Sequence, residues 1–412
     1  MPPPSPPDVG SGPPGQVPGS RTTHAIPAAG RALRPRRWRS GALAVVVLIS
    51  ATLSSCHAPG AFSTGQLHVL GNVLVDDLGR PVRLRGVNRS GGEYACTQVG
   101  KGIFDGPTDR PSMEAMRRWG VNVVRLPLNE TCWLGVAGVV PELSGETYQR
   151  AVRDYVVRLA DAGFYVILSL HWSSPEGPAT RLSPMPNRRN SPRFWRHVAA
   201  TFVDEPRVIL DLFNEPFPDD NQNSPEAWRC WAHGGTCAGV PFEAAGMHEL
   251  LRVVREAGAT QLVLLAGVQY AARLSRFAEL APFDPRFNLA ASWHVYNFSW
   301  CHEPWCWRSE VEPLMATHPV VTGEVGQDDC GSDFMLPVLD WLDARGGSYL
   351  AWTWNTWSCT SPSLLKDWSG TPQGDYGRAF RSRLLLPVAP AGHWAGGQRP
   401  RAWHDPLVFV LP

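Results

Sequence analysis

Two short apolar segments of this chain each end in a glutamate. Residues 208–216 read Val-Ile-Leu-Asp-Leu-Phe-Asn-Glu-Pro and carry Glu215, and residues 319–324 read Pro-Val-Val-Thr-Gly-Glu and end at Glu324. Both have the composition of a short strand buried on both faces. Proline disfavours the helical conformation in the residue before it, so Pro216 predicts an extended Glu215 that points out of the sheet. Either glutamate alone could be a strand-ending residue that meets water. Two convergent carboxylates can instead divide acid, base and nucleophile roles between them.

Polar and aromatic residues also stand at the ends of the other strand-like segments. They are Asn88, Arg125, His171, Asn214, His294, Tyr296, Trp352 and Trp354. Each has a structural explanation, because Arg125 could pair with Glu130, the histidines could be satisfied core residues and the tryptophans could fill the interior. As a set they suit hydrolysis of a glycosidic bond, in which one carboxylic acid protonates the leaving oxygen and the other carboxylate attacks the anomeric carbon. Tryptophan adds a flat apolar face for a sugar ring.

The sequence offers no competing catalytic or metal motif. It lacks a Gly-x-Ser-x-Gly elbow, a Cys-x-x-Cys pair and a His-Glu-x-x-His helix, and residues 235–239 look like a disulfide loop rather than a thiol site. We therefore expect no metal and no cofactor.

Strand and helix patterns alternate along the chain from residue 66 onward. The expected strands are 82–87, 121–126, 165–170, 208–213, 261–266, 289–293, 320–323 and 348–352. The expected amphipathic helices are 112–119, 146–162, 191–203, 242–257, 271–280, 307–317, 333–344 and 376–384. Eight strand–helix units predict an α/β fold, a (β/α)8 TIM barrel with its active site at the carboxyl ends of the strands. A doubly wound sheet is the alternative, but residues 86–92 lack the G-x-G-x-x-G spacing of its phosphate loop.

Composition bounds the organisation of the chain. Of 412 residues, 43% are apolar, which is enough for a large core, and the formal net charge is only +1 with 18% charged residues. A nucleic-acid partner is therefore not expected. We assign residues 66–386 to a single catalytic domain that acts as a monomer. Residues 387–412 are a Pro/Gly-rich tail, too short for a separate carbohydrate-binding module.

The amino-terminal residues resemble an export signal. Residues 1–40 are a Pro- and Gly-containing, basic leader that we expect to be disordered, or to reflect an upstream start codon, and residues 41–56 hold a short apolar run. The run ends in Leu53-Ser-Ser-Cys56, which resembles the lipobox of bacterial lipoproteins and implies lipid attachment to Cys56. The alternatives are an ordinary cleaved signal or twin-arginine export at Arg36-Arg37. Residues 57–65 would be a linker. We expect an exported protein, extracellular or on the cell surface, that meets the membrane only through this anchor.

Eight cysteines remain once Cys56 is set aside. An even number in an exported protein suggests disulfides. The expected pairs are Cys96–Cys132, Cys230–Cys237, Cys301–Cys306 and Cys330–Cys359.

Six segments carry a family resemblance. They are Asn122-Val-Val-Arg-Leu-Pro127, Leu168-Ser-Leu-His171, Leu210-Asp-Leu-Phe-Asn-Glu-Pro216, Trp293-His-Val-Tyr296, Val321-Thr-Gly-Glu324 and Ala351-Trp-Thr-Trp354. Together, over about residues 66 to 385, they resemble glycoside hydrolase family 5, the cellulase family.

The resemblance implies a role for each of these strand-end residues. Glu215 would be the acid/base and Glu324 the nucleophile, and Asn214 would bind the 2-hydroxyl of the sugar being cleaved. Four further residues would orient the glutamates and tune their charge: Arg125, His171, His294 and Tyr296. We expect Arg125 and Tyr296 to keep Glu324 ionised, and the charge of Glu324 to keep Glu215 protonated.

A tryptophan after the eighth strand would form the sugar platform. Trp352 and Trp354 are two residues apart and would face the same way in a strand, which leaves the choice open, although Trp354 lies nearer the expected mouth. Trp228 and Trp231, in the long segment after the fourth strand, could wall or widen the cleft.

The resemblance implies a β-linked oligo- or polysaccharide as substrate without identifying the sugar. An endo-β-1,4-glucanase is the first expectation. A β-mannanase, an exo-β-glucosidase or a glycolipid glycosidase on the same scaffold is the alternative. A carbohydrate-binding barrel without catalysis is a third class, and a pure binder has no need of two convergent acids.

Overall fold

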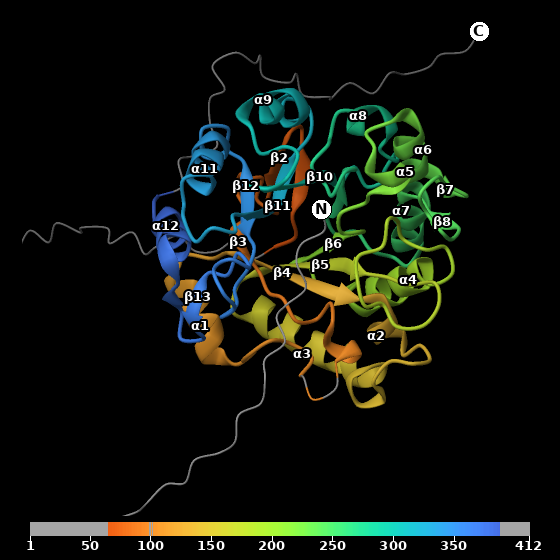
Figure 1. The fold of residues 1–412 in the computed structure, drawn as a ribbon, viewed down its shortest axis with the longest axis horizontal. Coiled ribbons are helices and arrows are strands. Elements are labelled where there is room, and N and C mark those ends of the chain that lie inside the picture. The colour runs from red at the N-terminus through yellow and green to blue at the C-terminus, as the bar shows by residue number, and fades with distance from the viewer. Residues whose placement is uncertain (1–64, 99, 101, 388–412) are drawn as a thin grey trace, which may run out of the picture. The chain divides into compact units, whose positions relative to one another are not determined.

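Eight parallel strands close into a barrel in the computed structural model, which describes residues 65–98, 100 and 102–387 (Figure 1). The strands are β3 (Arg85–Asn88), β4 (Val123–Asn129), β5 (Tyr165–Trp172), β6 (Val208–Asp211), β9 (Val263–Ala266), β10 (Leu289–Tyr296), β11 (Val320–Gly326) and β12 (Ser348–Ala351). Each strand pairs with its neighbours along the chain, and β12 pairs with β3 to complete the ring. The (β/α)8 barrel expected from the sequence is confirmed.

Helices surround the strands on the outside (Figure 1). They are α1 (Arg110–Arg118), α2 (Glu130–Leu134), α3 (Glu146–Asp161), α4 (Ser191–Thr201), α5 (Pro218–Asn221), α6 (Pro225–His233), α7 (Met247–Glu256), α8 (Phe277–Leu280), α9 (Pro304–Cys306), α10 (Glu312–Met315), α11 (Met335–Asp343) and α12 (Gly374–Leu384). Other helical turns are the 3-10 helices η1 (Ala95–Thr97) and η2 (Pro141–Leu143) and the π-helical η3 (Trp307–Val311). Three two-stranded ribbons complete the fold: β1 (His68–Leu70) with β2 (Val73–Val75), β7 (Gly234–Gly235) with β8 (Ala244–Ala245), and β13 (Leu365–Asp367) with β14 (Thr371–Pro372).

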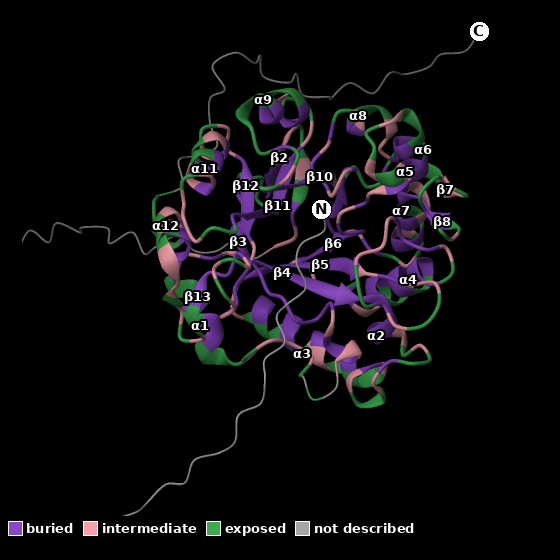
Figure 2. Cartoon of the chain, viewed as in Figure 1, coloured by how far each residue is buried: buried purple, intermediate pink, exposed green. Residues whose placement is uncertain are grey.

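Local sequence signals account for where several helices begin. The side chain of Asp109 accepts a hydrogen bond from the backbone of Ser112 at the start of α1, and Ser224 caps α6 in the same way. The barrel strands are buried on both faces, which explains their nearly continuous apolar runs (Figure 2).

The β1–β2 hairpin closes the amino end of the barrel. Its Leu67 and Leu74 are buried in one apolar cluster with side chains from the first residues of the barrel strands, among them Ile167, Ile209 and Leu264. The polar residues at the carboxyl ends of the strands therefore lie at the opposite, open end.

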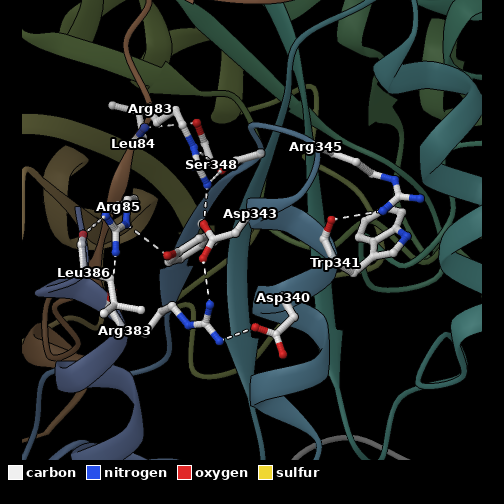
Figure 3. A network of polar contacts seen from close by, with 12 residues as sticks. Arg83, Leu84, Arg85, Asp340, Trp341, Asp343, Arg345, Ser348, Arg383 and Leu386 are labelled. Carbon is white, nitrogen blue, oxygen red and sulfur yellow. Dashed lines mark hydrogen bonds and ion pairs between the residues drawn. The ribbon is translucent and has the colours of Figure 1, made fainter. Parts of the chain in front are cut away.

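A polar network holds the junction between the last strand and the first (Figure 3). Asp343 of α11 accepts hydrogen bonds from Arg83 and from Arg383 of α12, and Leu84 donates its N–H to Ser348 at 3.0 Å. Because both guanidinium groups are largely buried and paired, the network fixes α11 and α12 against the seam between β12 and β3.

Two expected helices differ from the structure. The segment 271–280 is mostly loop and keeps only α8, because the carboxylate of Glu310 accepts hydrogen bonds from the backbone N–H groups of Leu274 and Ser275. The expected helix 242–257 begins only at Met247, because residues 244–245 pair with the β7 strand.

The segment after β6 does not present its tryptophans to a cleft. Trp228 and Trp231 are fully buried, and their indole N–H groups donate to Asn223 and to the backbone of Ala266. They pack edge to face with each other and support the scaffold, which corrects the expectation that they line a substrate site.

Four disulfides join the described cysteines in the pairs expected from the sequence. They are Cys96–Cys132, Cys230–Cys237, Cys301–Cys306 and Cys330–Cys359. All four lie in loops or short helices that follow barrel strands at the open end. The fourth bridge ties the loop after β11 to the loop after β12.

The predictions for the leader, the apolar run, Cys56 and most of the carboxyl-terminal tail concern residues outside the described ranges. Across the ranges that are described, no helix has the length and apolar character needed to cross a bilayer.

Replacing both Cys330 and Cys359 by alanine should lower the free energy of unfolding by about 3.5 kcal/mol, because their sequence separation of 29 residues closes a long loop. The matched control, alanine at Cys230 and Cys237, removes a bridge with a separation of only 7 and should cost about 2.5 kcal/mol. Urea unfolding of both variants measures the difference. An equal or smaller loss for the Cys330–Cys359 pair would contradict this loop-entropy account.

Candidate active site

Arg125 lies at the centre of the open end of the barrel. Its fully buried guanidinium donates from Nε to Asp211 at 2.9 Å and from Nη1 to Glu324 at 2.6 Å. Nη1 also donates to Asn88 Oδ1 at 2.9 Å, and Nη2 donates to Asn214 Oδ1 at 2.8 Å. Arg125 therefore joins the carboxyl ends of β3, β4 and β6 to β11.

The alternative pairing of Arg125 with Glu130 is wrong. Glu130 accepts hydrogen bonds from Ser174, Asn187 and Ser191, and so braces the loop after β5 instead.

The carboxylate of Glu324 accepts hydrogen bonds from two side chains. Its Oε1 accepts from Arg125, and its Oε2 accepts a hydrogen bond from the Tyr296 hydroxyl. Burial raises the pKa of Glu324, while His294 and Arg125 oppose that rise. Burial, together with the charge of Glu324, raises the pKa of Tyr296 well above its usual value, so its hydroxyl stays a donor. Both contacts stabilise an ionised Glu324.

Glu215 is in a different environment. Its Oε1 lies 2.9 Å from His294 Nδ1, and its side chain is 13% exposed. Burial raises the pKa of Glu215 to about 7, and the charge of Arg125 and the nearby side chain of Asn214 oppose that rise. Burial, rather than the expected charge of Glu324, is thus the main reason for the shift.

The backbone of Glu215 also differs from the expected extended conformation. Its φ is 52°, in the left-handed region that non-glycine residues seldom adopt. The strand β6 ends at Asp211, earlier than the expected Phe213, so the chain has already left the sheet before it reaches Glu215. The preference of a residue before proline for an extended conformation does not decide the backbone here.

Both histidines of the set are buried. Burial lowers the pKa of His294 to about 4, so its imidazole is neutral at neutral pH and carries one proton. Burial and the charge of Arg125 lower the pKa of His171 as well. The ring of His171 lies nearly parallel to Trp352, with centroids 5.5 Å apart.

The two tryptophans after β12 have different surroundings. Trp354 is fully buried and packs edge to face on Trp119, with centroids 4.9 Å apart, so it offers no free face. Trp352 is partly exposed beside His171. The expectation that Trp354 is the platform is therefore wrong. Side chains two residues apart point the same way only within a strand. The strand β12 ends at Ala351, before both Trp352 and Trp354.

Sequence reasoning missed two partners of Arg125. Asp211 and Ser169, whose hydroxyl accepts from Nη2 at 2.8 Å, lie inside strands that their mostly apolar sequences predict to be buried. A signal for Asp211 was present, since a charged residue within a buried strand requires a partner of opposite charge.

The two carboxyl groups lie close together. One oxygen of Glu215, one oxygen of Glu324 and one nitrogen of His294 all lie within 4.8 Å of one another. Three such atoms are also close enough together to coordinate a metal ion. The guanidinium of Arg125 already supplies a positive charge at Glu324, which disfavours a cation in the same place.

Comparison with known proteins agrees with this geometry. A family model described as Cellulase (glycosyl hydrolase family 5) matches residues 75–358. Endoglucanase N of Pectobacterium atrosepticum is 25% identical over 182 residues, which are 44% of this chain and 36% of that protein. Endoglucanase MaCel5A of Microbulbifer sp. (strain ALW1) is 24% identical over 320 residues, 73% of this chain and 55% of that protein. The chain thus spans only a third to about half of the length of these relatives.

Solved structures share the fold at low identity. A beta-glucanase, SdGluc5_26A from Saccharophagus degradans in complex with cellotetraose, has a TM-score of 0.60 at 22% identity and covers 81% of this chain and 98% of its own. A hyperthermophilic endocellulase from the archaeon Pyrococcus horikoshii has a TM-score of 0.61 at 19% identity and covers 78% and 99%. With the family model matched over most of the barrel, the chain belongs to the cellulase family, glycosyl hydrolase family 5.

Proposed function

We propose that this protein hydrolyses internal β-1,4-glucosidic bonds of a glucan with retention of configuration. The observation that carries the proposal is the approach of Glu215 and Glu324, with one oxygen of each inside a group of atoms that spans 4.8 Å. Retaining glycosidases place their carboxyl groups ~5 Å apart, whereas inverting enzymes need ~6.5–9.5 Å to admit a water molecule.

The surroundings of the two carboxyl groups support different roles. Glu324 accepts from the cationic Arg125 and from Tyr296, so its ionised form is stabilised as a nucleophile. Glu215 faces the neutral His294 and is held by burial at a pKa of about 7. Of the two interacting groups, Glu215 is the one that keeps a shared proton.

The chemistry then takes two steps. Glu215 donates its proton to the glycosidic oxygen while a carboxylate oxygen of Glu324 attacks the anomeric carbon. The bond to the leaving sugar breaks, and an ester between Glu324 and the remaining sugar forms. Glu215, now ionised, takes a proton from water, and the resulting hydroxide equivalent attacks the anomeric carbon and releases Glu324.

Asn214 is placed to bind the reacting sugar. Its Oδ1 is occupied by Arg125, whereas its buried Nδ2 has no well-formed hydrogen bond among the described residues, although it lies near enough to Glu215 to affect that pKa. A sugar hydroxyl would satisfy this donor, in agreement with the role that the family resemblance implies.

Aromatic side chains support an extended substrate. Trp352 is partly exposed and lies beside His171. The half-exposed Phe298 stacks on Tyr296, which donates to Glu324, with ring centroids 5.0 Å apart. Further along the same loop, Trp300 and Trp305 are exposed and meet edge to face. Several sugar rings could therefore lie beside the reaction centre, as internal cleavage of a polymer requires.

The same pair of glutamates would serve β-mannan, aryl or alkyl glucosides and glycolipids. The relatives named endoglucanase favour a glucan. A screen of the purified chain on carboxymethylcellulose, mannan, aryl glucosides and a glycosylceramide identifies the sugar. Failure on all four would favour the binding-only barrel.

We also propose that the protein is exported. Four disulfides fit an oxidising compartment. The basic leader and the apolar run before Cys56 supply the signal.

Changing either glutamate should separate the two roles. Glu324→Gln should lower kcat at least ~10³-fold on every substrate, because the nucleophile is lost. Glu215→Gln should lower kcat about 10²- to 10⁴-fold on polysaccharide and should spare the first step on glycosides with good leaving groups. Azide should then rescue this variant and give a glycosyl azide of retained configuration.

The control for these variants is Glu256→Gln, on the outer face of α7, which should be fully active. Proton NMR of the first-formed sugar gives the stereochemical check. An inverted product would rule out the covalent intermediate on Glu324.

Activity should fall as pH rises through about 7. The pKa of Glu215 is raised, so its proton is present below that pH and is lost above it. The measurement is the pH dependence of kcat/KM on an aryl cellobioside with a poor leaving group. In Glu215→Gln the alkaline fall should disappear. Its persistence there would assign the alkaline limb to another group.

Cys56 should carry lipid when the chain is produced in a bacterium with lipoprotein processing. The reason is its position at the end of a lipobox-like tetrapeptide after a basic and apolar leader. Detergent partitioning and mass spectrometry of the mature amino terminus measure this. A mature terminus that is unmodified, or that lies elsewhere, would contradict it.

A further inference from the structure

Many of the exposed large apolar side chains lie on segments at the amino end of the barrel, away from the catalytic residues. Among the described residues, eleven such side chains are exposed. Seven of them belong to segments that precede barrel strands or follow the last helix: Leu70, Leu78, Val203, Phe283, Phe287, Leu385 and Leu386. Isolated exposed apolar residues are normal, but several at one end of a barrel, two of which touch as Phe283 and Phe287 do, indicate an interaction surface.

Four of these residues define what we call the amino-end apolar face: Leu70, Leu78, Phe283 and Phe287. Their exposed fractions are 62%, 75%, 75% and 71%. The two phenylalanine rings meet edge to face with centroids 5.5 Å apart. Asn288 connects them to the β1–β2 hairpin, because it accepts from the Val69 N–H at 3.1 Å. The face therefore spans two segments that are fixed to each other.

This face is separate from the substrate site. Under this face, the β1–β2 hairpin closes the amino end of the barrel with the buried side chains of Leu67 and Leu74. Glu215 and Glu324 lie at the carboxyl ends of the strands, at the other end of the barrel. A partner bound to the amino-end apolar face would leave the active site open.

The course of the chain before the barrel indicates which partner binds the amino-end apolar face. The described residues begin at Gly65, whose backbone lies against the side chain of Asp77, the neighbour of Leu78. The chain thus enters the barrel beside the amino-end apolar face. Cys56 precedes Gly65 by nine residues, a length that can extend to at most about 30 Å.

We propose that the amino-end apolar face rests on a lipid bilayer, with Phe283 and Phe287 in the interfacial layer. A lipid on Cys56 would hold this end of the barrel near the surface, and the weak contact of the face would add to that of the anchor through a high effective concentration. Aromatic side chains are suited to the interface. The active site then faces away from the membrane, toward a soluble or wall-bound polymer.

The test removes the anchor and asks whether the face binds by itself. In a Cys56→Ser chain, Phe283→Ser combined with Phe287→Ser should weaken co-flotation with phosphatidylethanolamine/phosphatidylglycerol vesicles by about tenfold or more. The matched control is Phe298→Ser with Trp305→Ser, at the opposite end, which should bind vesicles as the parent does. Activity of the Phe283/Phe287 variant on a soluble substrate should be unchanged, which shows that it is folded.

A second measurement reports the position of the face directly. In the Cys56→Ser chain the other eight cysteines are in disulfides, so Phe283→Cys offers one thiol for an environment-sensitive dye. Vesicles should shift its emission to the blue, and the same dye at Phe298→Cys should not respond. A dye at residue 283 that stays in water on vesicle-bound protein would overturn the proposal.

Three other results would also overturn it. Vesicle binding that is equal in the Phe283/Phe287 variant and its parent would show that the face takes no part. Binding that appears only after deletion of residues 388–412 would assign the face to the chain's own carboxyl-terminal segment. A dimer in solution that dissociates in the Phe283/Phe287 variant would assign it to a second copy of the chain.

Discussion

A buried guanidinium organises the functional end of this barrel. Arg125 is fully buried, and a buried charge is tolerated only when it is paired and its hydrogen bonds are satisfied. Two carboxylates, Asp211 and Glu324, provide the opposite charge, and the amide oxygens of Asn88 and Asn214 and the hydroxyl of Ser169 accept its remaining N–H groups. Since these partners come from different strands, the pairing of one side chain sets the relative positions of the strand ends and of the residues that would touch substrate.

The same guanidinium makes the two glutamates chemically unequal. Burial favours the protonated form of both, but only Glu324 has a cation in direct contact. Glu215 faces His294, whose own burial keeps the imidazole neutral and so removes a second source of positive charge. The two carboxyl groups, which have oxygens within 4.8 Å of each other, therefore differ in that only one has a cation in contact to oppose the effect of burial.

The two ends of the barrel have different roles. At the amino end the β1–β2 hairpin seals the core, and the Arg83–Asp343–Arg383 network closes the seam between β12 and β3 (Figure 3). At the carboxyl end the loops are longer and carry the polar residues, and all four disulfides lie among them. Cross-links there restrict the segments that regular hydrogen bonding restrains least, which keeps the side chains of the site in place.

The alternation of strand and helix patterns and the carboxylates at the strand ends predict the barrel and its two glutamates, because both are local signals. Close spacing likewise predicts the Cys230–Cys237 and Cys301–Cys306 bridges, whereas the two more widely separated cysteine pairs do not follow from spacing alone. The long segment 271–280 shows the limit of such signals, since its amphipathic pattern is overridden by the carboxylate of Glu310, distant in sequence. Contacts between segments distant in sequence determine that Arg125 pairs with Asp211 rather than Glu130, and that Trp352 is partly exposed whereas Trp354 is fully buried. These outcomes depend on which strands and loops become neighbours in space, and the spacing of residues along one segment does not contain that information.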